Sequence, residues 1–172
     1  MIQCVGSRDE ARPNCRRVCC GEAVKNALKL KELSPETAVY VLFRDVRTYG
    51  FKEAFYTEAR RKGVVFARYD ETRKPAVAEE GGRLQVRTWE PIARTEVVIP
   101  ADLVVLSVAT IPHPENKDLA QLLKVPLDPT GFFLEAHMKL RPVDFATEGI
   151  FLCGAAHFPK PGPGDLRVDY VL

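Results

Sequence analysis

Residues 2–33, IQCVGSRDEARPNCRRVCCGEAVKNALKLKEL, decide the fold and carry the most informative feature of the chain. The stretch opens with a short apolar run, Ile2 to Gly6, which predicts a strand. From about Arg16 to Leu33 the apolar residues recur at helical spacing, which predicts a helix. A buried strand that leads into an amphipathic helix is the opening unit of an α/β domain.

The next elements repeat this alternation of strand and helix. Residues 38–43 form a continuous apolar run, as buried parallel strands do. A second helix is predicted over 51–62, with Gly63 as its stop, and a third strand over 64–69. The order predicts an α/β fold with a Rossmann-like parallel sheet and flanking helices.

The rest of the chain is less regular. An antiparallel β flap is predicted within 74–99, where Gly81-Gly82 forms a hairpin turn, and a buried strand is predicted over 101–108. We place one domain at 1–110 and a second segment at 111–172. In that segment we expect a short helix near 119–123, strands at 131–134 and 149–153, and an irregular tail over 159–172.

Four of the five cysteines lie within the first twenty residues, at Cys4, Cys15, Cys19 and Cys20. Four thiolates that converge on one place are what a [4Fe-4S] cluster or a tetrahedral zinc ion requires. A helix that begins with Cys15 puts Cys15 and Cys19 on one face and Cys20 about 100° further round, while Cys4 approaches from the strand. Ligands spread in this way favour a cluster over a single ion, and the positive end of the helix would stabilise thiolates.

Three alternatives stay open for these cysteines. They are buried thiols without a metal, a zinc site, and a redox disulfide between Cys19 and Cys20. The disulfide ranks last because a bridge between adjacent cysteines is strained. A cysteine group at one end of the chain is unlike the disulfide framework of a secreted protein, so we expect a reducing, cytoplasmic setting.

Charge and hydropathy exclude several classes of partner. The chain has 172 residues with 25 basic and 23 acidic side chains, a net charge of +2, so no strong field draws it to nucleic acid or to an anionic membrane. No run approaches the roughly 20 apolar residues that span a bilayer. We therefore expect neither a nucleic-acid nor a membrane partner.

The order of these motifs resembles the A subunit of heterodisulfide reductases. The resemblance extends to about Lys160 and rests on IQCVGSRDE (2–10), the cysteine spacing, KNALK (25–29), RDVRT (44–48), FFLEAH (132–137), LRPVD (140–144) and GIFLCG (149–154). It implies an iron-sulfur flavoprotein with a thioredoxin-reductase-like core, in which FAD exchanges electrons with clusters. It also implies that this chain is one piece of that core, namely the NAD(P)-domain-like unit followed by the start of the returning FAD-domain segment within 111–172. The N-terminal FAD half would be absent, and FAD would be held only in the complete protein or complex.

The resemblance also assigns roles and partners. The partners would be other subunits or domains of a heterodisulfide reductase-like complex, and a homodimer is left open. Since the sequence has no G-x-G-x-x-G, the cysteines would take the place of the phosphate loop, and nicotinamide binding would have been exchanged for a metal centre. The residues expected near the flavin are Lys25, Cys153, Gly154, Ala155, Ala156 and His157.

Each of these flavin residues has a plainer interpretation. Lys25 is equally well an exposed helix lysine, and Cys153 is best read as a small hydrophobe within an apolar strand. His157 stands where related flavoproteins usually have an acidic residue, which leaves that contact in doubt. Arg44, Asp45 and Arg47 are interpreted as a structural ion-pair group or a contact with another subunit.

We predict from these observations that the chain is an electron-transfer part that relays single electrons between a flavin and other clusters, without being active as an enzyme alone. The alternative is a zinc-bound or metal-free assembly module of such a complex, without electron transfer of its own.

Overall fold

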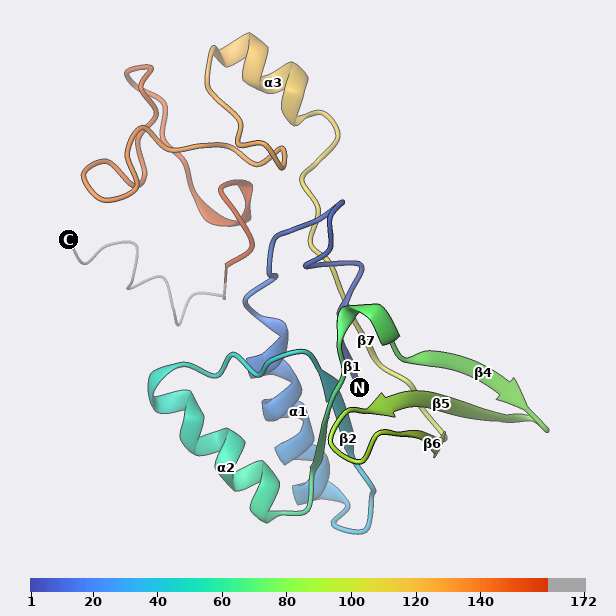
Figure 1. Cartoon of the computed structure of the whole chain (residues 1–172). Helices are drawn as coiled ribbons and strands as arrows, with labels where there is room; N and C mark the ends of the chain where they lie inside the picture. Colours follow the sequence, from blue (N-terminus) through green and yellow to red (C-terminus); the bar gives the residue numbers. More distant parts are fainter. Residues whose placement is uncertain (161–172) are drawn as a thin grey trace.

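The computed structural model of the protein describes residues 1–160 and has an α/β fold (Figure 1). Its centre is a four-stranded parallel sheet with the strand order β3-β2-β1-β7. The strands are β1 (Ile2–Val5), β2 (Tyr40–Phe43), β3 (Val65–Arg68) and β7 (Leu106–Val108). The Rossmann-like parallel sheet predicted from the sequence is confirmed.

Two helices cover one face of this sheet, α1 (Cys19–Leu33) and α2 (Glu53–Arg61), the latter preceded by the short 3-10 turn η1 (Gly50–Lys52) (Figure 1). Small side chains let α1 lie close to the strands. Ala27 is fully buried and packs in one cluster with Val24, Val41 and other apolar residues of the helices and strands. Close packing of this kind fixes the height and direction of α1 over the sheet.

An antiparallel sheet lies against the opposite face. It consists of β4 (Ala76–Glu80), β5 (Arg83–Glu90) and β6 (Thr95–Ala101), and follows the 3-10 turn η2 (Glu71–Arg73). Its buried residues join Ile2 and Leu42 of the parallel sheet in a second core cluster. Gly81 and Gly82 form the predicted hairpin turn, with φ of +61° and +76°, a conformation that favours glycine at both places.

The last described part, 109–160, holds α3 (Asn116–Leu123), the 3-10 turn η3 (Gly154–Ala156) and loops around a small core of their own. The strands predicted at 131–134 and 149–153 are wrong, because each contributes only one isolated bridge, Leu127 to Phe133 and Asp144 to Phe151. Their apolar side chains fill the small core from loops instead. The expected irregular tail lies beyond Lys160, outside the described residues.

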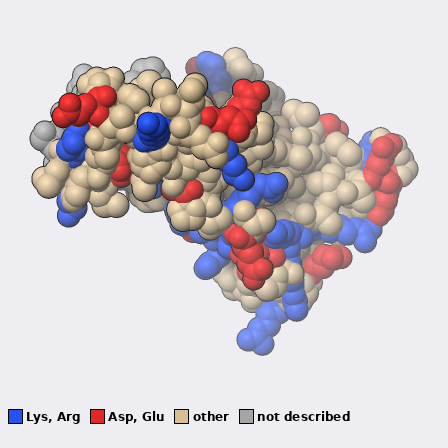
Figure 2. Space-filling view, turned by 90° about the horizontal axis from the view of Figure 1, so that it is seen from above, with Lys and Arg blue, Asp and Glu red and all other residues tan. Residues whose placement is uncertain are grey.

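Two features concern the surface. Figure 2 shows basic and acidic side chains interspersed over the face seen from above, which agrees with the near balance of charge. None of the helices within residues 1–160 is long and apolar enough to cross a membrane.

Candidate metal centre

The first cysteine lies at an irregularity in the central strand. Cys4 is a residue of β1 with a φ of +60°, and the pairing of β1 with β7 changes register between Ile2 and Val5. As a result Ile2 and Val5, three residues apart, both pack toward the antiparallel sheet. Non-glycine residues in the left-handed region are uncommon and cluster at functional sites.

Cys19 and Cys20 form the first turn of α1, and both are buried. The thiol of Cys20 approaches the backbone oxygen of Asp45, just beyond β2, at 3.8 Å. The helix begins at the carboxyl end of the strands, and no side chain caps its first turn. The free amides and the positive end of the helix dipole are therefore directed at this edge of the sheet.

The helix begins later than the sequence suggests. We predicted a start near Cys15 or Arg16, with Cys15 and Cys19 on one helix face, and this is wrong. Arg17 has a φ of +63°, which interrupts the helical path, and Val18 is the N-cap. Cys15 lies in the loop before α1, half-exposed, where its Sγ accepts a hydrogen bond of 3.3 Å from the backbone N–H of Arg17.

Other cysteines lie near enough to Cys4 and to Cys19 to influence the pKa of each. The pKa of Cys4 is raised, chiefly by burial, with Cys20 and Cys15 adding to the rise and a hydrogen bond from Arg8 opposing it. The pKa of Cys19 is raised by its hydrogen bond with Cys20, then by burial, and then by the other cysteines. The fold therefore brings Cys4 and the three cysteines of the loop and helix together.

Cys19 and Cys20 are hydrogen-bonded to each other, which shifts their pKa values in opposite directions. The hydrogen bond from Cys19 lowers the pKa of Cys20 to about 6, against the opposing effect of burial. Cys20 is thus the first of the pair to ionise. The thiolate is the form of cysteine that binds metals, so this pair is prepared for a ligand role.

A group of charged residues surrounds the cysteines. The Arg8 guanidinium contacts both the Asp45 carboxylate and, at 3.8 Å, the Sγ of Cys4, while Arg47 donates to Asp45 at 2.8 Å. Burial alone would raise the pKa of Asp45, but the hydrogen bonds from Arg47 and Arg8 lower it. Arg44 pairs with Glu71 at 2.8 Å. Asp45 and Arg47 form an ion pair as predicted, whereas Arg44 pairs with Glu71, and the alternative of a contact with another subunit stays a prediction.

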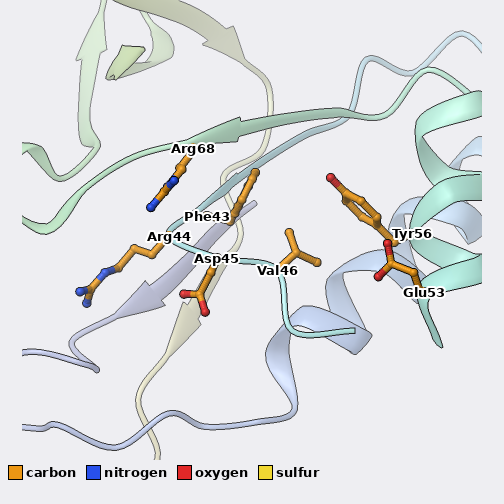
Figure 3. A pocket seen from close by; sticks show the side chains of 7 residues that line it. All are labelled: Phe43, Arg44, Asp45, Val46, Glu53, Tyr56 and Arg68. Carbon is orange, nitrogen blue, oxygen red and sulfur yellow. The ribbon is translucent and has the colours of Figure 1, made fainter. Parts of the chain in front are cut away.

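An open pocket of about 330 Å³ lies beside this group (Figure 3). The pocket lies between the end of β2, the start of α2 and β3, and it is lined by Phe43, Arg44, Asp45, Val46, Glu53, Tyr56 and Arg68. Its two arginines and two acidic residues give it a mixed charge. No cysteine lines it, so it is separate from the candidate metal centre.

Within residues 1–160, no three histidine, cysteine, aspartate or glutamate side chains are arranged to hold one metal ion. A tetrahedral zinc ion needs sulfur donors about 2.3 Å from a single point. A [4Fe-4S] cluster is ligated through separate iron atoms, so its cysteine sulfurs are neighbours without meeting at one point. The donor set of neighbouring thiols, with amide and arginine donors around it, is chemically suited to such a cluster.

The residues expected near a flavin lie in two parts of the molecule. Lys25 is on the exposed side of α1, where its ammonium group pairs with Glu22. Gly154, Ala155 and Ala156 form η3, with Gly154 in the left-handed region at a φ of +61°. Cys153 is exposed and not part of a strand, so the expectation of a buried strand cysteine is wrong.

His157 belongs to a buried pair that the sequence did not predict. Its Nε2 contacts the carboxylate of Glu135, and the side chains of Glu135 and His157 are only 9% and 10% exposed. The two residues are 22 positions apart and belong to loops, so no local spacing could have identified them. The pair fixes the turn that follows η3.

A small pocket lies between the loop that precedes α1, called the cysteine loop here (residues 13–17), and the segment after η3. It has a volume of about 160 Å³ and is lined by Pro13, Asn14, Cys15, Arg17, Arg47, Phe158 and Pro159. The Arg17 guanidinium lies over the Phe158 ring, 4.5 Å from its centre. Asn14 also donates to Thr130 at 2.8 Å. The candidate metal centre and the candidate flavin segment are therefore in contact through this loop.

Comparison with curated proteins gives the family. The chain is 42% identical over 164 residues to the A subunit of the ferredoxin:CoB-CoM heterodisulfide reductase of Methanosarcina acetivorans, and this match covers 93% of the chain and 20% of the relative. The chain belongs to the family of heterodisulfide reductase A subunits. The iron-sulfur A subunit of the CoB-CoM heterodisulfide reductase of Methanocaldococcus jannaschii is 42% identical over 168 residues, with 94% of the chain and 25% of the relative covered.

The chain spans only a fifth to a quarter of the length of these two relatives, so it corresponds to one segment of a heterodisulfide reductase A protein. No family model matches it. Among solved structures, the thioredoxin reductase of T. acidophilum aligns with 92% of the chain and 44% of its own length at a TM-score of 0.52 and 15% identity. This likeness concerns the fold alone, and it agrees with the Rossmann-like architecture.

Proposed function

We propose that this chain is the electron-transfer part of a heterodisulfide reductase A-like oxidoreductase. It would hold one [4Fe-4S] cluster at Cys4, Cys15, Cys19 and Cys20. When bound, such a cluster takes up and releases one electron at a time. In the complete protein or complex it would exchange electrons with FAD and with other clusters, and the other subunits or domains would be its partners.

One observation carries this proposal. Four thiols from the end of β1, the following loop and the first turn of α1 lie near one another, at the place where a dinucleotide-binding domain has its phosphate loop. The helix start that favours a phosphate also favours an anionic iron-sulfur cluster, because both are stabilised by free amides and by the helix dipole. The scaffold would therefore serve a metal centre in place of a nucleotide.

The protein's own residues would hold and tune the cluster. Arg8 contacts the sulfur of Cys4, and the amide of Arg17 donates to the sulfur of Cys15. Donors to sulfur stabilise the more negative, reduced form and so raise the reduction potential. Cys4, Cys19 and Cys20 are buried, which limits the access of water to these three thiols.

The flavin role rests on the segment that contacts the cysteine loop. We infer that Cys153, Gly154, Ala155, Ala156 and His157 would approach FAD when the rest of the protein supplies its other contacts. The pocket between Cys15 and Phe158 and the stacking of Arg17 on Phe158 support a short path between the two centres. The role proposed for Lys25 is also a contact with FAD, and it requires the bound flavin to reach the exposed side of α1.

Cysteine variants test the ligand set. The chain, purified and reconstituted without oxygen, should give a paramagnetic resonance signal of a reduced [4Fe-4S] centre after dithionite treatment. Serine at any of the four cysteines should remove or change the signal, whereas Cys153→Ser, outside the set, should keep it. An unchanged spectrum in all four single variants would contradict the ligand assignment.

The same preparation distinguishes the assembly alternative. A zinc-bound module would contain one zinc without sulfide, and a metal-free module would contain neither. Either of these results would replace the electron-transfer proposal with a structural role for the cysteines.

A further inference from the structure

Gln3 has a buried amide without a partner. Its side chain is only 1% exposed, and within residues 1–160 neither Nε2 nor Oε1 has a hydrogen-bond partner. Among the residues less than 2% exposed it is one of the largest side chains, together with Leu42 and Val41, which are apolar. A buried amide left in this state destabilises the fold relative to one that is hydrogen-bonded.

The backbone places this amide under the cysteines. Met1 packs into the cluster beneath α1, and Ile2 packs into the cluster on the opposite face. Since successive side chains of a strand alternate, Gln3 faces α1. It directly precedes Cys4, and α1 opens with Cys19 and Cys20 at the same edge of the sheet (Figure 1).

The position of Gln3 in the strand is also fixed by its own backbone. The hydroxyl of Tyr69, at the end of β3, donates to the Gln3 carbonyl oxygen. Tyr69 is itself close enough to Cys4 and Cys19 for their charges to affect its pKa. The backbone of Gln3 is therefore held by a buried tyrosine that also lies near the thiols of Cys4 and Cys19.

A purely structural role does not explain the choice of glutamine. Every other interaction of Gln3 described above is made by its backbone, which any residue would provide. An apolar side chain of the same length would fill the space without the cost of an unpaired amide. A buried amide at such a place indicates a hydrogen-bond partner that arrives with the ligand.

We propose that Gln3 positions and tunes the metal centre by donating a hydrogen bond from Nε2 to a sulfur atom of the bound cluster. The inference rests on the proposed function. The bond would be stronger in the reduced, more negative state of the cluster, so Gln3 would raise the reduction potential. Binding of the cluster would also satisfy the amide that is unpaired in the metal-free chain.

The test compares Gln3→Met with wild type in the full chain, reconstituted with iron and sulfide. Methionine has a similar length and lacks the N–H donor. Gln121→Met, at an exposed position of α3, is the matched control, and Gln3→Leu is a second variant at the same site. The readouts are the midpoint potential from a redox titration followed by paramagnetic resonance, and the thermal stability with and without the cluster.

Two results of opposite sign are expected. The equilibrium constant for reduction should fall three- to tenfold in Gln3→Met, where tenfold corresponds to about 59 mV for one electron. The metal-free variant should be more stable than metal-free wild type, because the unpaired amide is gone. Gln121→Met should change neither quantity.

The outcomes separate this inference from the function on which it rests. If wild type takes up a cluster, and both Gln3 variants show its potential and spectrum unchanged, then Gln3 has no such role although the cluster proposal stands. If wild type takes up no iron and sulfide, the proposed function itself fails.

Discussion

Replacing Tyr69 by phenylalanine tests how the end of β1 is held beneath the cysteines. The tyrosine is only 4% exposed, and its hydroxyl donates to the backbone oxygen of Gln3, the residue before Cys4. The variant keeps the ring and removes only this donor. It therefore isolates one hydrogen bond that joins the ends of β3 and β1.

The expected magnitude follows from burial. A typical hydrogen bond contributes about 1 kcal/mol to stability, and an acceptor left unpaired inside the protein adds to the loss. We expect Tyr69→Phe to lower the free energy of unfolding by about 1 to 2 kcal/mol, or the melting temperature by about 2 to 8 °C. Tyr49→Phe, at a residue that is 67% exposed, should remain within about 0.5 kcal/mol of wild type.

The same variant predicts a change in alkaline stability. Burial, with a smaller effect of the Cys4 charge, raises the pKa of Tyr69 from 10 to about 12. Because the folded pKa is the higher one, the buried phenol stabilises the protein fully below pH 10 and loses this contribution as the pH rises toward 12. A difference of two units corresponds to at most about 3 kcal/mol.

Urea unfolding of the metal-free, reduced chain at pH 7 and in steps up to pH 11 measures both effects. Wild type should lose stability above pH 10 more steeply than Tyr69→Phe. If the variant is as stable as wild type at pH 7 and has the same alkaline profile, then the hydroxyl does not hold β1, and the account of this edge of the sheet is wrong.

Two further predictions concern charged pairs. Hydrogen bonds from Arg47 and Arg8 outweigh burial and hold the pKa of Asp45 below 3.8, so its carboxylate stabilises the fold above that pH and loses this effect as the pH falls. With Asp45→Asn, the free energy of unfolding should therefore fall less between pH 5 and pH 2 than it does in wild type. Asp102→Asn, the control, should behave as wild type, and an unchanged pH dependence in Asp45→Asn would argue against the pairing. Glu135→Ala should lower the free energy of unfolding by about 1 to 3 kcal/mol because it removes the buried carboxylate that His157 contacts. Hydrogen exchange should then become faster over 133–157, and equal protection in the variant would mean that the pair does not stabilise this segment.

Elements with strong patterns were predictable from the sequence. The continuous apolar runs of β2 and β3 and the glycine pair between β4 and β5 identified the parallel sheet and the flap, because burial on both faces and a positive φ each restrict residue choice. The apolar loops near Phe133 and Phe151 were mistaken for strands. A short apolar segment that fills a small core resembles a strand in composition, and only its partners distinguish the two.

The candidate site was predictable in its residues and not in its local geometry. The cysteine spacing pointed to one group of thiols, but the left-handed backbone at Cys4 and Arg17 was not visible in the sequence, since neither is glycine. This is why the helix begins at Cys19 and Cys15 belongs to a loop. The unpaired amide of Gln3 and the pair of Glu135 with His157 depend on tertiary contacts and needed the structure.

Iron and acid-labile sulfide, determined on the chain reconstituted and purified without oxygen, test the central claim most directly. The account predicts about four iron and about four sulfide per chain, as in a [4Fe-4S] centre, with uptake lost when Cys4, Cys15, Cys19 and Cys20 are replaced together. One zinc per chain without sulfide, or a folded chain that takes up no metal, would contradict it.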